Sequence, residues 1–188
     1  NAQLVSFEPH TLYRHDVFKY IENDVKWQPT GVPVDAAKPQ WFESAAIARL
    51  ITQRARSLIK AQITKNPIPD AVELPVDLCP QLDSLFISVL MKGQIQGCMG
   101  KTIKHLDEDV QTLAQAVLSD ARFAKQLNAE NIDQLVLKIY LLYAPLDLGP
   151  YKPEEVMNPV RFCEQALMVH QGDKNGILLP DVPVLFNY

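Results

Sequence analysis

The chain has 188 residues, of which 47% are hydrophobic and 21% are charged, and its formal net charge is -4. This length suffices for one well-buried domain, and this composition is far from that of a disordered chain. The acidic balance gives no general attraction to nucleic acids or to anionic membranes. No apolar run reaches the roughly 18 residues that a membrane-spanning helix needs, and the first residues (NAQLV) carry no signal-peptide pattern.

The N-terminal half of the chain predicts two helices with a loop between them. Residues 11–26 favour a short helix with Thr11 as its N-cap. A proline-rich loop or linker follows over Trp27 to Pro39. Residues 43–63 predict a stronger helix, because apolar residues recur at helical spacing without an intervening glycine or proline. That apolar stripe consists of Ile47, Leu50, Ile51, Ala55, Leu58, Ile59 and Ile63.

The same helix carries several basic residues outside its apolar stripe: Arg49, Arg54, Arg56, Lys60 and Lys65. A cationic face can bind phosphates or an acidic partner. Because the chain is acidic overall and no surface aromatics interleave with these charges, a solvated face is favoured over a nucleic-acid surface.

The C-terminal half predicts strands joined by short turns. Residues 84–91 and 94–99 form two strands around a tight turn at Lys92-Gly93. Asp107 is then the predicted N-cap of a helix whose apolar stripe is Val110, Leu113, Ala114, Val117 and Leu118. A buried strand over 135–143 is bounded by Pro145, and residues 167–170 and 177–179 form a hairpin with Asn175-Gly176 as its turn signal. Together these elements predict an α+β fold, an antiparallel sheet with flanking helices.

The pattern that most strongly indicates function is Gly97-Cys98-Met99-Gly100, at the end of a predicted strand. Glycines on both sides of a cysteine allow close backbone approach and can surround a thiol with N–H groups. Such donors lower the pKa of a thiol and can stabilise an oxyanion. The alternative is a small buried cysteine that fills a tight strand crossing, because free cysteines are among the most buried residues.

Other chemistry around this cysteine is limited. Gly100-Lys101-Thr102 resembles the end of a phosphate-binding loop, but that signature requires a glycine where Ile95 stands, so nucleotide hydrolysis is not predicted. His105 and His170 are candidate bases for the thiol, although a half-exposed strand end is the simpler interpretation of His170.

Arg122, in the stretch Asp120-Ala121-Arg122-Phe123, is either a structural ion pair or an anion clamp. The three cysteines, Cys79, Cys98 and Cys163, are odd in number and far apart. This favours reduced thiols in a cytoplasmic compartment and predicts neither a metal site nor a cofactor.

Three landmarks occur in order along the chain: Gln96 to Gly100, Ser119 to Phe123, and Gly176 to Val182. In this order and spacing the chain resembles the AMMECR family over about residues 43–182. The usual pattern of that family is a Leu-Arg-Gly-Cys-Ile-Gly strand, an Asp-x-Arg-Phe helix end and a Leu-Pro-x-Val near the C-terminus. Two departures stand out, because Gln96 replaces the arginine and Met99 replaces the isoleucine, which removes a fixed charge and its bidentate fork.

The resemblance implies two unequal subdomains around an antiparallel sheet, with the cysteine motif near the cleft between them. It places the domain at residues 41–188, after an accessory segment at 1–40. The family's activity is unsettled, but gene neighbourhood implies a link to Memo-like and radical-SAM proteins and hence to a modification pathway. The C-terminal segment beyond the Leu-Pro-x-Val motif is short here, which indicates a fragment of a longer protein.

Two functional hypotheses follow. In the first, the protein is an enzyme in which Cys98 is the nucleophile and a small acidic substrate is bound with the help of Gln96, Gly97, Gly100, Arg122 and His170. In the second, the glycines and Cys98 shape a groove for a partner protein or a small ligand, and no bond is made or broken.

Overall fold

The computed structural model of the chain has an α+β fold, with two α-helices and six strands in the part of the chain that it describes. The described residues are 3–12, 45–71, 82–123, 126–150, 165–171 and 173–182, apart from the side chains of 3–12, 45–48, 144, 146–150 and 170. Contacts divide the chain into two units. The first unit comprises Asn1–Pro9, His15–Ala37 and Leu142–Tyr188, and the second comprises His10–Arg14 and Lys38–Leu141.

The second unit is built on the strands β2 (Leu82–Met91), β3 (Gln94–Thr102) and the start of β4 (Val136–Pro150), in the order β3-β2-β4. β2 and β3 form an antiparallel hairpin that turns at Lys92 and Gly93, whose φ angles are 50° and 79°. Positive φ at both turn residues gives the tight turn whose twist suits neighbouring strands. The predicted hairpin and its turn are therefore confirmed, and β3 extends as far as Thr102.

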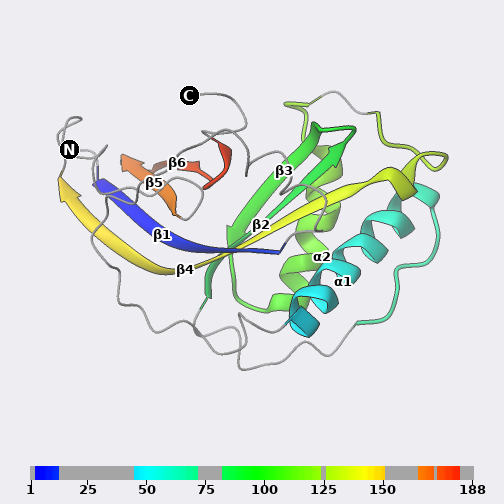
Figure 1. Ribbon diagram of the computed structural model, residues 1–188, viewed down its shortest axis with the longest axis horizontal. Helices are drawn as coiled ribbons and strands as arrows, with labels where there is room; N and C mark the ends of the chain where they lie inside the picture. The colour runs from blue at the N-terminus through cyan, green and yellow to red at the C-terminus, as the bar shows by residue number, and fades with distance from the viewer. Residues whose placement is uncertain are drawn as a thin grey trace. The chain divides into compact units, whose positions relative to one another are not determined.

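Two helices, α1 (Ala45–Thr64) and α2 (Leu106–Ala116), pack against each other, and α2 also packs on β2 and β3 (Figure 1). Both helices were predicted from their apolar spacing. Their buried residues include Ile51, Ala55, Leu58 and Ile59 of α1 and Val110, Leu113 and Ala114 of α2. The residues Leu85, Ile87 and Val89 alternate along β2 and are fully buried, so they form the sheet side of this core. Neither helix is long and apolar enough to cross a membrane, among the residues that the structure describes.

Arg54 joins three segments of the second unit. It is only 3% exposed, and its Nε and Nη2 contact the two carboxylate oxygens of Asp107 at 2.7 and 3.1 Å. Its Nη1 donates to the carbonyl oxygens of Pro69 and Asp70, both at 2.9 Å. A buried guanidinium is tolerated because this fork and these carbonyls satisfy its donors.

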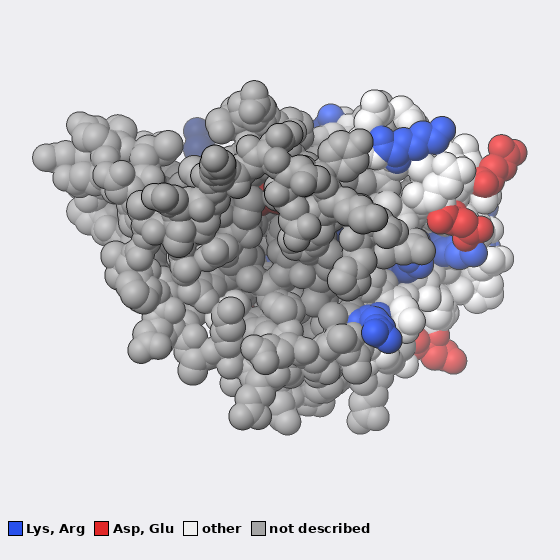
Figure 2. All heavy atoms as spheres, viewed as in Figure 1, with Lys and Arg blue, Asp and Glu red and all other residues white. Residues whose placement is uncertain are grey.

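The predicted basic face of α1 is therefore divided between the interior and the surface. Arg54 is internal, whereas Lys60 is an exposed residue that pairs with Asp133 at 3.1 Å. Over the described part of the face shown in Figure 2, basic and acidic side chains are interspersed.

The start of α2 differs from the prediction. Its N-cap residue is His105, which makes no side-chain cap hydrogen bond, and the predicted cap, Asp107, binds Arg54 instead. Asp109 ties the chain that enters the helix to its first turn, because its Oδ2 accepts the backbone N–H groups of Lys104 and His105 at 2.6 and 2.9 Å. Burial alone would raise the pKa of Asp109, but the Lys101 ammonium and these two N–H groups hold it below its usual value.

The first unit contains residues 3–9 of β1 (Gln3–Leu12), together with β5 (Ala166–Gln171), β6 (Lys174–Leu178) and the end of β4, in the order β4-β1-β5-β6. β1 pairs antiparallel with β5, from Gln3 opposite His170 to Phe7 opposite Ala166. Thr11 lies in β1 and is not the predicted N-cap of a helix, because a place in the sheet outweighs a local capping signal. Residues 13–26 of that predicted helix lie outside the described residues.

Two predicted boundaries shift in the strands near the C-terminus. β4 continues past Pro145 to Pro150, which is possible where the strand ladder needs no N–H donor. The predicted β5–β6 hairpin is confirmed, but Gln171 pairs with Lys174, so Asn175 and Gly176 lie within β6 and not in the turn. Gly-Asp and Asn-Gly both suit a two-residue turn, so the turn residues alone could not fix the register.

Replacing Arg54 by methionine is expected to lower the free energy of unfolding by about 3 kcal/mol, because Asp107 loses its partner and two carbonyls lose their donor. Lysine at the same position should recover little of this, since an ammonium cannot form the fork. Urea denaturation followed by circular dichroism measures the change.

The exposed Arg49 of the same helix provides the matched control, and Arg49→Met should change stability by less than about 0.5 kcal/mol. Equal losses for the two variants would show that the buried fork is not what holds these segments together.

Candidate functional site

Cys98 lies in the middle of β3 and faces Ser88 of β2 across the hairpin. The Ser88 hydroxyl donates a hydrogen bond to the Cys98 sulfur, with an Oγ to Sγ distance of 3.1 Å. Ser88 is 5% exposed, whereas Cys98 is partly exposed. A donor directed at the sulfur favours the thiolate over the thiol. Ser88 is thus the polar side chain that contacts the sulfur from the neighbouring strand.

The backbone of Cys98 is held from the outer edge of β3, the first strand in the order β3-β2-β4. Its N–H donates to Oδ2 of Asp120 at 3.0 Å, and its carbonyl oxygen accepts a hydrogen bond from Nη2 of Arg122. In an antiparallel pair, residues alternate between bonding the partner strand and pointing away from it. The two side chains therefore supply the acceptor and the donor that a further strand would supply.

Asp120 and Arg122 also bind each other. Nε and Nη2 of Arg122 donate to Oδ1 and Oδ2 of Asp120 at 2.9 and 2.8 Å, and the Arg122 backbone N–H donates to Oδ1 at 3.2 Å. These hydrogen bonds, with that from the Cys98 N–H, hold the pKa of Asp120 well below its usual value although burial opposes this. The Asp120 carboxylate in turn raises the pKa of Arg122 although burial opposes this, and an ionised Cys98 would add to the rise. Both members of the pair are charged throughout the physiological pH range.

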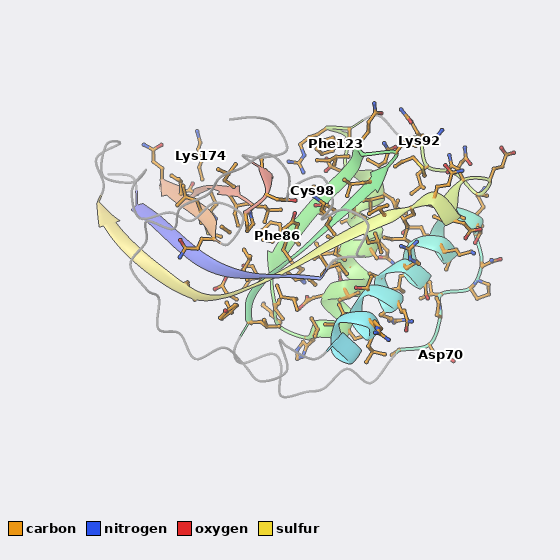
Figure 3. All side chains as sticks on the ribbon, viewed as in Figure 1. Asp70, Phe86, Lys92, Cys98, Phe123 and Lys174 are labelled. Carbon is orange, nitrogen blue, oxygen red and sulfur yellow. The ribbon has the colours of Figure 1, made fainter. Side chains whose placement is uncertain are left out.

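Arg122 is anchored but not buried. Its side chain is 65% exposed, while that of Asp120 is 3% exposed. The guanidinium carbon lies over the ring of Phe123, 5.4 Å from the ring centroid. Figure 3 labels Phe123 and Cys98 beside this edge of the hairpin. The site therefore combines a partly exposed cysteine with an anchored, exposed guanidinium.

The two glycines flanking Cys98 are required by close packing on opposite faces of β3. A Cβ on Gly97 would lie 2.1 Å from the backbone oxygen of Val117, which begins the 3₁₀ turn η4 (Val117–Ser119). A Cβ on Gly100 would lie 2.0 Å from the ring of Phe86, its cross-strand partner. Because side chains two residues apart share a face of a strand, the Phe86 ring stands on the same face as the Cys98 thiol.

Gln96, which stands where the resembling family has arginine, occupies a β-bulge. Val89 pairs with Gly97 and Leu90 with Ile95, so Gln96 is the extra residue. Its side chain is buried, and its Oε1 accepts the backbone N–H of Gln126 at 2.6 Å. The described contacts of Gln96 thus connect β3 to the segment after Phe123.

The two candidate histidines occupy different units. His105 is an exposed residue at the start of α2 in the second unit. His170 belongs to β5 of the first unit, and its side chain lies outside the described part of the chain. A catalytic pairing of either with Cys98 stays a prediction. Among the described residues, no three His, Cys, Asp or Glu side chains gather as they would around a metal ion.

The structure brings together three of the residues singled out from the sequence, namely Cys98, Gly100 and Arg122, and adds three others. Asp120 was within a recognised motif but was not selected. Phe86 and Ser88 follow from the strand register, which the sequence does not fix. The one available signal was alternation, since residues 84, 86 and 88 share a face of the predicted strand.

A hairpin bearing an edge-strand cysteine, capped by an Asp-x-Arg-Phe turn and packed on two helices, defines this chain as an α+β protein with a thiol-centred candidate site. The AMMECR1 family model matches residues 52–187, so the chain belongs to the AMMECR1 family, as its motifs predicted.

Its relatives include a protein of Methanosarcina acetivorans, 27% identical over 71% of this chain and 69% of that protein. Another, from Methanothermobacter thermautotrophicus, is 29% identical over 71% of each chain. The crystal structure of the uncharacterized protein PH0010 from Pyrococcus horikoshii has the same fold, with a TM-score of 0.62 and 24% identity over 74% of this chain and 71% of that chain. The names of these three proteins state no activity.

The Asp120–Arg122 ion pair should make a pH-dependent contribution to the free energy of unfolding. Because the pKa of Asp120 is lowered in the folded state, its contribution is complete above the unfolded value of about 3.9 and is lost as the pH falls below it. Asp120→Asn should therefore be less stable at neutral pH and should lose less stability on acidification, by up to about 1.4 kcal/mol per pH unit. Urea unfolding at several pH values tests this.

Asp133→Asn serves as control, because Asp133 pairs with Lys60 while 87% exposed. Its profile should run parallel to that of the unaltered protein. Parallel profiles for Asp120→Asn as well would refute a stabilising role for the edge pair.

Substituting Gly97 or Gly100 by alanine should destabilise the protein, but a second substitution at Phe86 should restore stability in only one of the two cases. Gly100→Ala is expected to cost about 1–3 kcal/mol by overpacking against the Phe86 ring, and Phe86→Leu in the same chain should return part of that loss. Gly97→Ala should cost at least as much and should not be relieved by Phe86→Leu, because the obstructing atom is a backbone oxygen. Thermal unfolding of the single and double variants measures the coupling, and equal rescue of both would be inconsistent with this packing.

Proposed function

We propose that the second unit carries a cysteine-centred reactive site, in which Cys98 is the nucleophile and Arg122 orients a small acidic substrate. The observation that supports this most directly is the anchored cation. Asp120 holds the Arg122 guanidinium on the carbonyl of Cys98, yet the Arg122 side chain stays 65% exposed beside a partly exposed thiol.

The reacting form is the thiolate, which the Ser88 hydroxyl stabilises by its hydrogen bond to sulfur. The thiol proton leaves to solvent before the attack. The sulfur then supplies the electron pair of a new S–C bond to an electrophilic carbon of the substrate, and the displaced group departs with the pair of the bond that breaks. Arg122 contributes by fixing the acidic group of the substrate near the sulfur.

One observation favours the second candidate function, a binding module without bond chemistry. The Cys98 N–H already donates to Asp120 at 3.0 Å, so it is not open to a developing oxyanion. In this alternative the same anchored guanidinium and the Phe86 ring recognise a ligand that does not react.

The rate of alkylation of Cys98 by iodoacetamide, measured across pH by mass spectrometry of its peptide, separates the two functions. As a nucleophile, Cys98 should reach half its maximal rate below the pH of about 8.5 at which a free thiol titrates. Ser88→Ala should move that midpoint upward, because the sulfur loses its O–H donor.

Ser84→Ala is the matched control, since Ser84 is buried on the same strand but donates to Asp83 and not to the thiol. It should leave the midpoint unchanged. Alkylation that stays slow at every pH until the protein unfolds would exclude the nucleophile and leave the binding module.

A further inference from the structure

We infer that the acidic group this site takes is a singly charged carboxylate on a short apolar body, and not a phosphate. This inference names the substrate class of the proposed function and rests on it. Two features of the described residues support it, namely the charge around the thiol and the ring beside it. The N–H donors of Arg122 that remain unused set where the acidic group binds.

Among the contacts of the described residues, one nitrogen of the Arg122 guanidinium is left for a ligand. Of its five N–H donors, those on Nε and Nη2 are used by both oxygens of Asp120 and by the carbonyl of Cys98. Within the described part of the chain, Nη1 has no partner. Its two N–H bonds diverge, so Nη1 cannot form the paired, parallel bonds by which arginine grips carboxylates and phosphates. It can donate to one oxygen of either anion, so the choice between them depends on charge and on the apolar surface beside the thiol.

The charges at the site disfavour a doubly charged ligand. The buried Asp120 carboxylate neutralises Arg122, so the pair offers an oriented dipole and no net positive charge. The thiolate then makes the site anionic, and each further negative charge on the ligand is repelled by it. A carboxylate brings one such charge, whereas a phosphate monoester brings nearly two at neutral pH.

The ring of Phe86 supplies an apolar surface on the thiol side of the hairpin. It covers Gly100, whose missing side chain makes the room for it, and it is partly exposed. Phe86 and Cys98 share this face of the two strands, and Figure 3 labels both. A ligand whose carboxylate meets Nη1 can therefore rest a short aliphatic or aromatic body on the ring, near the sulfur.

Protection of Cys98 from iodoacetamide tests the inference. Butyrate, its uncharged analogue butyramide and methyl phosphate are compared as protectants by the concentration that halves the alkylation rate. Butyrate should protect at a concentration roughly tenfold or more below that of either other compound, since one hydrogen bond to a charged group is worth about that factor. Arg122→Gln should abolish the advantage of butyrate, and Lys104→Gln, which removes an exposed charge from the same unit, should not.

The outcomes separate the inference from the proposed function. If Cys98 is reactive but methyl phosphate protects as well as butyrate, the carboxylate class is wrong and the nucleophile stands. If Cys98 is unreactive, the nucleophile is wrong, and titration of the Cys98 and Arg122 amide resonances with the same three compounds still decides the ligand class. Resonance shifts caused by butyrate alone would support the carboxylate class. Equal shifts with all three compounds, or no shift with butyrate, would overturn the carboxylate class.

Discussion

The peptide of Cys98 presents an N–H and a carbonyl at the outer edge of β3, and the satisfaction of these two groups governs the arrangement around it. An edge strand leaves such groups unpaired, and unpaired groups invite association with other strands. Here Asp120 accepts from the N–H and Arg122 donates to the carbonyl. Both side chains come from one short turn after η4. A single ion pair therefore provides the acceptor for the N–H and the donor for the carbonyl of this edge strand. The consequence is a guanidinium fixed beside a thiol.

The sequence predicted the helices and strands of the second unit better than it predicted which residues pair between β2 and β3. Unbroken apolar spacing identified α1, α2, β2 and β3, because burial of one face determines helix and strand patterns. Counting back from the turn at Lys92 and Gly93, however, would set Ser88 opposite Gly97. The bulge at Gln96 moves Ser88 opposite Cys98, and this one-residue shift creates the contact between hydroxyl and sulfur. A bulge has no sequence signature comparable to that of a turn, so this partner could not be foreseen.

Caps and ion pairs were predictable only as sets of alternatives. Asp107 and Asp109 both lie in the first turn of α2, where any acid is favoured by the helix dipole. Which one reaches back to the free N–H groups depends on where Arg54 lies, and that follows from the packing of α1 on α2. Arg122 was equally ambiguous between a structural pair and an anion clamp. The structure shows the ion pair with Asp120 directly. Because the Arg122 guanidinium is also exposed, the same residue can in addition bind an anion.

The contacts of Gln96 bear on the charge that this chain lacks relative to the usual family pattern. Gln96 joins the backbone of Gln126 through a buried amide, so its described contacts fasten the chain just after the Asp120 turn. The fixed positive charge near Cys98 comes instead from Arg122, which is tied to the Cys98 carbonyl itself. A neutral residue at the bulge therefore does not leave the thiol without a neighbouring cation. Arg122 and Ser88 contact Cys98 at different atoms, because Arg122 donates to its carbonyl oxygen and Ser88 donates to its sulfur.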